Sequence, residues 1–230
     1  MIKTIIFALT FSFAIEAMAQ KEQVLQELST ADIELIEKGQ FIQKTKDVPG
    51  SAWPEITQYG LVEATPLESM GIFSALDYQK EYVPNVIKSK PVKHISAVEV
   101  LTEYEMHVPF PFSNALYTHG AVVHKYDEDY ELTWYKVEST STEEVKGSAY
   151  FLPYKNSTLF RYRSYIKPKS KLGSLIKKIM LRDVQKSIES IRTHIEQLKK
   201  ENSPLLAKYS EFIKGALHGE FVYKNVIEKK

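Results

Sequence analysis

LGSLIKKIMLRDVQKSIESIRTHIEQL, residues 172–198, contains one continuous apolar stripe at helical spacing. Its members recur every three or four positions: Leu172, Leu175, Ile176, Ile179, Met180, Val184, Ile188, Ile191, Ile195 and Leu198. This pattern predicts a long helix that begins near Leu172 and lies with its stripe across one face of a sheet. Asn202-Ser203-Pro204 then stops the helix and predicts a last amphipathic helix at roughly 204–217.

Upstream of this helix, residues from about 86 to 167 alternate between apolar and polar side chains, which is the period of a β-strand. The alternation predicts an antiparallel meander whose strands are joined by Pro-, Asn-, Asp- and Ser-containing turns. The predicted strands are Val92–Val108, Ala115–Tyr126, Tyr130–Glu138, Glu144–Leu152 and Thr158–Ile166. On the last strand, Arg161 and Arg163 alternate with Phe160 and Tyr162, so we expect the two arginines on the solvent-facing side.

A capped helix precedes the strands. Thr65-Pro66-Leu67-Glu68 places Thr at the N-cap, Pro at the first helical position and Glu three residues after the cap. The helix is expected to break near Asp77-Tyr78, and a second short helical segment ends at Val83-Pro84-Asn85.

The chain before the capped helix begins with a predicted helical lead-in at residues 20–31. Residues 33–46 predict a strand interrupted at Gly39, and Ile56–Ala64 predicts a second extended segment. Asp47-Val48-Pro49-Gly50 is the turn expected between them.

Residues 1–19 have the three parts of a cleavable secretory signal peptide in order. Lys3 supplies the positive charge, Ile5–Ile15 supplies a short apolar stretch, and Ala17-Met18-Ala19 matches the small-x-small cleavage pattern before Gln20. A membrane anchor is the alternative, but the apolar stretch is shorter than the about 20 residues that span a bilayer. We therefore expect an exported protein, periplasmic in a Gram-negative cell or secreted, with no transmembrane segment after cleavage.

Composition narrows the class of partner. The chain has no Cys, which excludes a disulfide framework and a lipid-modified Cys after the leader. Its net charge of +1 argues against nucleic acid, because binding phosphates requires a basic surface. The 14 Tyr and 11 Phe supply rings that can build a core or line a pocket for an amphipathic ligand.

This order of elements predicts an α+β fold in which a curved antiparallel sheet wraps around the long C-terminal helix, with two short helices after the first strand. A sheet that bends around a helix without touching it along its whole length leaves a cavity between them. The two short helices after Thr65 are expected to form one mouth of that cavity.

Several segments in this order resemble the START-like, or SRPBCC, superfamily with its helix-grip fold, of the polyketide cyclase and lipid-transfer type. The resemblance covers about residues 33–200 and rests on these segments: Trp53-Pro54-Glu55, Ala64-Thr65-Pro66, residues 73–78, Tyr82–Val86 and Val108–Asn114. The last resembles a family turn that usually continues with an Arg-Asp pair. Here Ala115 and Leu116 follow instead, so no role of that pair is carried over.

The resemblance implies a domain that encloses a hydrophobic ligand, commonly a lipid, sterol, quinone or polyketide. We divide the chain into a signal peptide at 1–19, a START-like ligand-binding domain at 20–202 and a C-terminal helical tail at 203–230. The tail helix is expected to cover an open end of the cavity, to pack on the outer edge of the sheet, or to meet a membrane or a partner.

No motif for catalysis or for a cofactor is present: the chain has no G-x-S-x-G elbow, no glycine-rich phosphate loop and no HExxH. His119 and His124 share one predicted strand but are five residues apart, so they point to opposite faces and are poorly placed for a metal. We therefore expect no metal, no cofactor and no catalytic residue.

Side chains expected to line the cavity come from the apolar faces of the capped helix, the strands and the long helix. They are Phe73, Tyr104, Met106, Trp134, Tyr150, Phe160, Tyr162, Ile176, Ile179 and Met180. For each of them, ordinary core packing is the alternative.

Three functions remain open. The first is a non-enzymatic, exported, soluble binding or transfer protein for a hydrophobic or amphipathic, lipid-like small molecule. The second is a cyclase or aromatase type of enzyme, which convergent polar groups such as His107 or Tyr104 inside the cavity would favour. The third is a partner-binding module with a collapsed interior and an exposed apolar patch.

Overall fold

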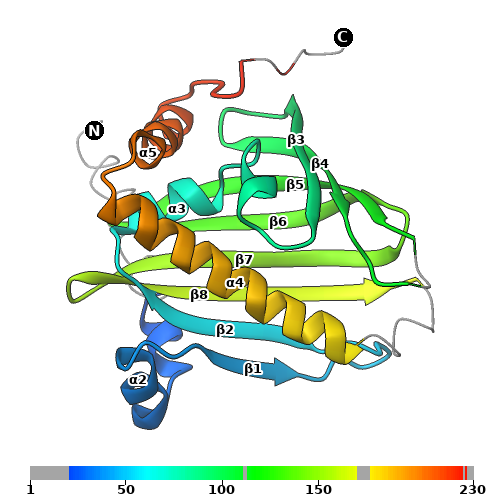
Figure 1. Ribbon diagram of the computed structural model, residues 1–230, viewed down its shortest axis with the longest axis horizontal. Helices are drawn as coiled ribbons and strands as arrows, with labels where there is room; N and C mark the ends of the chain where they lie inside the picture. The colour runs from blue at the N-terminus through cyan, green and yellow to red at the C-terminus, as the bar shows by residue number, and fades with distance from the viewer. Residues whose placement is uncertain (1–20, 111–112, 170–176, 225, 227–230) are drawn as a thin grey trace, which may run out of the picture.

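A computed structural model of the chain describes residues 21–110, 113–169, 177–224 and 226. The leader predicted at residues 1–19 lies outside the described residues. In chain order, the helices and strands shown in Figure 1 are α2 (Thr30–Glu37), β1 (Ile42–Lys46), β2 (Glu55–Val62), α3 (Pro66–Phe73), the 3₁₀ turn η1 (Gln79–Glu81), β3 (Val86–His94), β4 (Glu99–Met106), β5 (Ala115–Tyr126), β6 (Asp129–Ser139), β7 (Thr142–Tyr154), β8 (Ser157–Pro168), α4 (Lys177–Lys200) and α5 (Pro204–Leu217).

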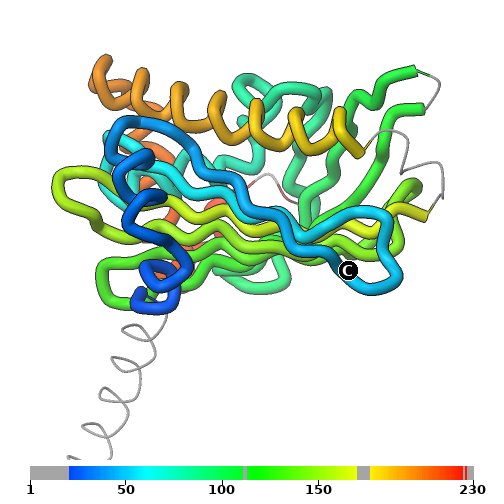
Figure 2. The backbone as a smooth tube through the Cα atoms, turned by 90° about the horizontal axis from the view of Figure 1, so that it is seen from below, coloured from blue at the N-terminus to red at the C-terminus, as the bar shows by residue number. Residues whose placement is uncertain are grey.

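Eight strands within the described residues form one antiparallel sheet in the order β1-β2-β8-β7-β6-β5-β4-β3. The first hairpin joins the last strand through the β2–β8 pair, and β3 forms the opposite edge. Helix α4 crosses one face of the sheet diagonally, and the sheet curls toward it near β3 and β4 (Figures 1 and 2). We call this the inner face and the opposite one the outer face. The predicted helix-grip, α+β architecture is confirmed.

Helix α3 begins where its sequence predicts. The Thr65 hydroxyl oxygen accepts a hydrogen bond from the Glu68 backbone N–H at 3.3 Å, and the Glu68 carboxylate accepts one from the Thr65 backbone N–H at 2.9 Å. These bonds pair N–H groups that the start of a helix otherwise leaves unpaired. With η1, α3 supplies the two short helical segments expected at this point of the chain.

The tail helix α5 lies against α3 at one end of the inner face (Figure 1). A Cβ atom at Gly71 would lie 2.9 Å from the backbone carbonyl carbon of Tyr209, so glycine permits this close approach of the two helices. Leu206, Tyr209 and Ile213 of α5 join the same core as Phe73. The tail helix therefore packs within the molecule and closes one end of the inner face.

Helix α4 buries only the second half of its apolar stripe. Ile188, Ile191, Ile195 and Leu198 are buried in the main core between α4 and the sheet. The described residues from Lys177 to Val184 are half-buried or exposed, and the predicted first turns at residues 172–176 lie outside the described residues. The helix thus grips the sheet at one end and stands away from it at the other.

The outer face carries its own cluster under the N-terminal segment. Val24, Leu28 and Ile36 pack there with Tyr59 and Tyr150 of the sheet. This segment covers part of the sheet that the alternation along β8 predicts to be exposed to solvent.

The expectation that Arg161 and Arg163 face solvent is wrong for Arg161, whose side chain is 8% exposed. Arg161 lies 3.7 Å from carboxylate oxygens of both Glu27 and Glu131, and Arg163 donates to Glu27 at 2.6 Å. The N-terminal segment brings Glu27 over the arginines, and paired charges can be buried where single ones cannot.

Two predicted segments are corrected. Residues 30–37 are helical, because Ser29 and Asp32 form a capping box that outweighs the apolar pattern of the predicted strand at 33–46. The predicted strand Val92–Val108 is a hairpin of β3 and β4, whose turn at residues 95–98 contains no Gly, Pro, Asn or Asp.

Candidate ligand-binding cavity

A cavity of about 220 Å³ lies between the inner face and the first half of α4, where the helix stands away from the sheet. Strands β3 to β8 supply its floor and one wall, and α3, η1 and α4 supply the rest. Its lining residues are Phe73, Leu76, Gln79, Val83, Asn85, Val86, Thr102, Tyr104, Met106, His107, Tyr117, His119, Ala121, Leu132, Trp134, Val145, Tyr162, Ser164, Ile166, Met180, Asp183, Val184, Ser187, Ile188 and Ile191.

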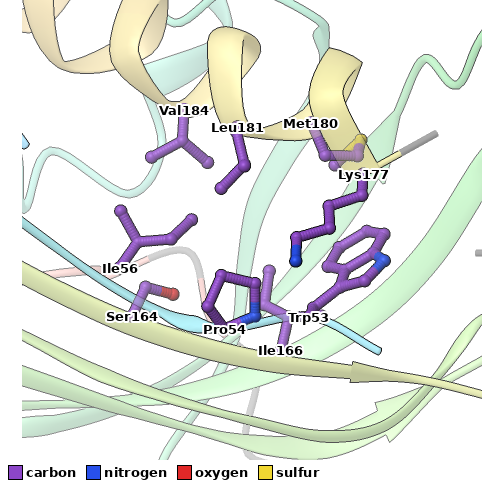
Figure 3. A pocket seen from close by; sticks show the side chains of 9 residues that line it. All are labelled: Trp53, Pro54, Ile56, Ser164, Ile166, Lys177, Met180, Leu181 and Val184. Carbon is purple, nitrogen blue, oxygen red and sulfur yellow. The ribbon is translucent and has the colours of Figure 1, made fainter. Parts of the chain in front are cut away.

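A smaller recess of about 20 Å³ lies beside the cavity, under the start of α4 (Figure 3). Met180, Leu181 and Val184 project from the helix toward Pro54 and Ile56 across this recess (Figure 3). The recess and the cavity share four lining residues, Ser164, Ile166, Met180 and Val184. The recess is therefore a side extension of the same space between helix and sheet.

Most of the residues expected at the cavity line it. They are Phe73, Tyr104, Met106, Trp134, Tyr162 and Met180. The structure brings them together from α3, β4, β6, β8 and α4. That they contact a ligand stays a prediction.

Tyr150 lies elsewhere, on the outer face. Side chains alternate along β7, and Ala149 and Phe151 on either side of Tyr150 belong to the inner core. The Tyr150 hydroxyl donates to Asp129 on the outer face at 2.9 Å.

Phe160 and Ile179 do not line the cavity either, and Ile176 lies outside the described residues. Phe160 points to the inner face, but its ring centroid lies 5.1 Å from that of Phe151 and 5.7 Å from that of Phe73. It is therefore core beneath the cavity wall. Ile179 is half-buried on α4 and borders neither the cavity nor the recess.

An arc of polar rings lines the β4–β5 side of the cavity, and of its members the sequence predicted Tyr104 but not Tyr117 or His119. The rings of Tyr104 and Tyr117 stack with centroids 5.1 Å apart, and His119 lies 4.3 Å from Tyr117. The Tyr104 hydroxyl donates to Oε1 of Gln79 at 2.7 Å. Thr102 lies directly across from His119 in the β4–β5 register.

Burial keeps this arc uncharged at pH 7. It raises the pKa of Tyr104, Tyr117 and Tyr162 above the usual tyrosine value, and it lowers the pKa of His119 to about 4. The described lining residues include no Lys and no Arg, and Asp183 of α4 supplies the one carboxylate among them. The cavity is mainly apolar, with neutral hydrogen-bonding groups.

The part of the sheet next to this arc, on β6 and β8, is aromatic. The ring of Trp134 stacks on that of Tyr162 at 5.3 Å and lies 6.3 Å from that of Phe73. A Cβ atom at Gly147 would approach the Trp134 ring to 2.3 Å, so the absence of a side chain there lets the indole lie flat on the sheet. The indole thereby leaves open space above the strands.

No protein-family model matches the chain, and no curated protein matches it in sequence. Solved structures share its fold. A STAR-related lipid transfer protein from Xanthomonas axonopodis aligns with a TM-score of 0.61 at 14% identity, covering 67% of this chain and 93% of that one. Human STARD10 aligns with a TM-score of 0.62 at 14% identity, covering 77% and 76%. Human StAR-related lipid transfer protein 5 aligns at 0.61 and 12% identity, covering 82% and 98%.

These similarities show that the chain has the START-like fold, as the resemblance in its sequence predicts. In the part of the chain that the structure describes, no three His, Asp or Glu side chains are grouped to hold a metal ion. Over the same residues, no helix combines the length and the apolar character needed to cross a membrane.

Proposed function

We propose that this protein binds or transfers a hydrophobic or amphipathic, lipid-like small molecule, which it holds between the sheet and α4. The cavity of about 220 Å³ carries the proposal. For comparison, an engineered apolar cavity of about 150 Å³ is large enough to bind benzene. Burying apolar ligand surface against the aliphatic and aromatic lining is favourable by about 25 cal/mol for each Å² removed from water.

Fold analogy supports the lipid-like character of the ligand, because the solved structures described above include proteins named as lipid transfer proteins. The two kinds of side chain on the sheet side of the cavity also suit an amphipathic molecule. Trp134 and Tyr162 offer ring faces, and the arc from Tyr104 to His119 offers hydrogen bonds.

Mass spectrometry of organic extracts tests this proposal. Protein purified from its native host is expected to carry an extractable hydrophobic compound, and stripped protein is expected to bind the neutral dye Nile red in a saturable manner. Absence of both an extractable ligand and saturable dye binding would contradict the proposal.

We further propose that the mature protein is soluble and acts outside the cytoplasm, on the strength of the leader pattern at residues 1–19. Expression of the full chain in a Gram-negative host, followed by intact-mass analysis of the periplasmic fraction, tests this. A protein that begins at Gln20 is expected. Accumulation in the cytoplasm of a chain that retains Lys3 and Ile5–Ile15 would contradict it.

An enzyme of the cyclase or aromatase type is a second candidate, because Tyr104, Tyr117 and His119 converge on the cavity. A general base works best with a pKa near the operating pH, and His119, with a pKa of about 4, is far from it at pH 7. We therefore rank binding first. Incubating the protein with a hydrophobic extract of its host separates the two functions, because only an enzyme produces new compounds in the chromatogram.

The third reading, a partner-binding module, expects a collapsed interior. The open space between α4 and the sheet argues against it.

A further inference from the structure

Two buried polar atoms at the cavity have no hydrogen-bond partner among the described residues: Oγ1 of Thr102 and Nε2 of His119. Both residues line the cavity, and Thr102 is fully buried. Buried polar groups in folded proteins are almost always hydrogen-bonded. Two neighbouring buried atoms without a hydrogen-bond partner therefore require an explanation.

These two residues are direct neighbours across the β4–β5 pair, on the inner face. Side chains at directly opposed positions of antiparallel strands have Cβ atoms only about 4.5–5.5 Å apart. A single ligand oxygen placed between them would contact both side chains. The hydroxyl of Thr102 donates or accepts, and Nε2 of His119 does either, depending on the ring tautomer.

The charges around the cavity exclude an ionised partner at this point. The described lining of the cavity includes no Lys and no Arg, and Lys177 lies in the adjoining recess, which Thr102 and His119 do not line. An anion between these two residues would therefore find no countercharge beside it. His119 does not supply one at pH 7, because burial lowers its pKa to about 4. A buried cation is also disfavoured beside Thr102 and His119, because the neighbouring rings of Tyr104 and Tyr117 stay protonated and neutral. The carboxylate of the lining, Asp183, lies on α4 and is 3.9 Å from Arg182.

We propose that the cavity selects an uncharged ligand with a hydroxyl or carbonyl oxygen, which binds between Thr102 and His119 while its apolar part lies against Trp134. This inference rests on the proposed function and names the chemical class of its ligand. The polar oxygen completes the hydrogen bonding of the two orphaned atoms. An ionised carboxylate would accept the same hydrogen bonds, but it would lose its hydration without a countercharge beside it.

Displacement of Nile red at pH 7.5 by ten-carbon compounds that differ only at one end tests the proposal. The compounds are decane, 1-decanol, 2-decanone, decanoate and decylammonium. We expect 1-decanol or 2-decanone to bind at least tenfold more tightly than decanoate and decylammonium. Comparing 1-decanol with 2-decanone shows whether the site prefers a hydroxyl or a carbonyl oxygen. Decanoate that binds as tightly as both neutral compounds would overturn the proposal.

Thr102→Val removes the hydroxyl with little change in shape, and we expect it to reduce the advantage of the better neutral compound over decane about tenfold. His119→Phe is expected to act in the same direction. Thr133→Val is the matched control, because Thr133 pairs with His124 on the outer face, with the oxygen and nitrogen atoms 3.1 Å apart. An unchanged ratio in both Thr102→Val and His119→Phe would overturn the proposal.

Binding of a hydrophobic ligand and selectivity for a neutral oxygen are tested separately by these measurements. If Nile red does not bind the unmodified protein, the proposed function fails and this inference falls with it. If Nile red binds but the five compounds displace it without regard to their end groups, the binding function stands and the selectivity for a neutral oxygen is wrong.

Discussion

The two faces of the same sheet are built from opposite chemistry. The inner face presents neutral rings and aliphatic side chains and leaves a cavity of about 220 Å³. The outer face, under residues 21–37, presents Arg161 and Arg163, which pair with Glu27 and Glu131. Alternation along each strand allows one backbone to serve both purposes.

This difference separates stability from binding. On the outer face, Glu27 joins three groups: it lies near Arg161, it accepts a bond from Arg163, and the Tyr59 hydroxyl donates to it. On the inner face, the first half of α4 makes few buried contacts, which is the condition for an open interior. We infer that the outer face stabilises a sheet whose inner face is incompletely packed.

Replacing Arg161 of the outer face is expected to have the largest effect on the free energy of unfolding. Arg161→Ala leaves the buried Glu131 without its ion-pair partner, while Glu27 keeps Arg163. It also removes the guanidinium that lies 5.4 Å from the Tyr150 ring. We expect a loss of about 3 kcal/mol in the free energy of unfolding, or about 10 °C in Tm, with unchanged ligand affinity. Thermal unfolding checks this, with the exposed Arg182→Ala as control. Equal losses in the two variants would contradict the account.

As the pH falls, the free energy of unfolding is expected to respond first to His119 on the inner face. The folded-state pKa of His119 is about 4, below its ordinary value of 6.5, so the unfolded chain takes up its proton first as the pH falls. The free energy of unfolding therefore falls between pH 6.5 and 4, by up to about 1.4 kcal/mol per pH unit for this group. His119→Phe is expected to make the free energy of unfolding less dependent on pH between 6.5 and 4. Above pH 7.5 the pH dependence is expected to be the same in both proteins. An equally steep dependence in the variant would contradict the account.

The outer face responds only at lower pH. Burial alone would raise the pKa of Glu27, but hydrogen bonds from Tyr59 and Arg163 outweigh it, and the net shift is below the ordinary 4.5. Its stabilisation is complete above about pH 4.5 and is lost as the pH falls through the lowered value.

Filling the cavity is expected to reduce binding without comparable loss of stability. Val184→Phe places a ring between α4 and the sheet, where Val184 borders both the cavity and the recess. We expect Nile red to bind at least tenfold more weakly. Gln185→Phe, at the next and exposed position of the helix, is the matched control. Dye titration that gives the same affinity for both variants would argue against this site.

The smallest expected effect on stability comes from a change in the N-terminal segment that covers the outer face. Ser29→Ala removes the cap that accepts a hydrogen bond from the Asp32 backbone N–H at 3.1 Å. We expect α2 to lose about 1 kcal/mol and the protein about 2–4 °C in Tm, with unchanged dye binding. A change in dye affinity in this variant would show that the two faces are coupled.

Local signals in the sequence carry much of the fold. The cap at Thr65, the period-two strands and the long amphipathic helix each depend on neighbours within a few residues, and the structure confirms them. The helix at 30–37 was missed because an apolar pattern was given more weight than the Ser29 capping box. The β3–β4 turn is not predicted because it contains no Gly, Pro, Asn or Asp.

The site was less predictable because the direction of a side chain depends on distant segments. Along β5, Tyr117 and His119 alternate with Leu116 and Gly120, so neither set is clearly the apolar one, and the sequence does not decide which set faces inward. Arg161 could be placed in the core only by knowing that Glu27, far away in the chain, covers it. Tyr150 was assigned to the wrong face for the same reason, because both faces of β7 are buried.

Quenching of Trp134 fluorescence tests the central claim, that the inner face holds a hydrophobic ligand, most directly. The chain has two tryptophans, so a Trp53→Phe protein reports from the cavity wall alone. We expect a brominated long-chain alcohol to quench this emission saturably, with one molecule bound per chain. Emission that stays unchanged up to the solubility limit of the compound would contradict it.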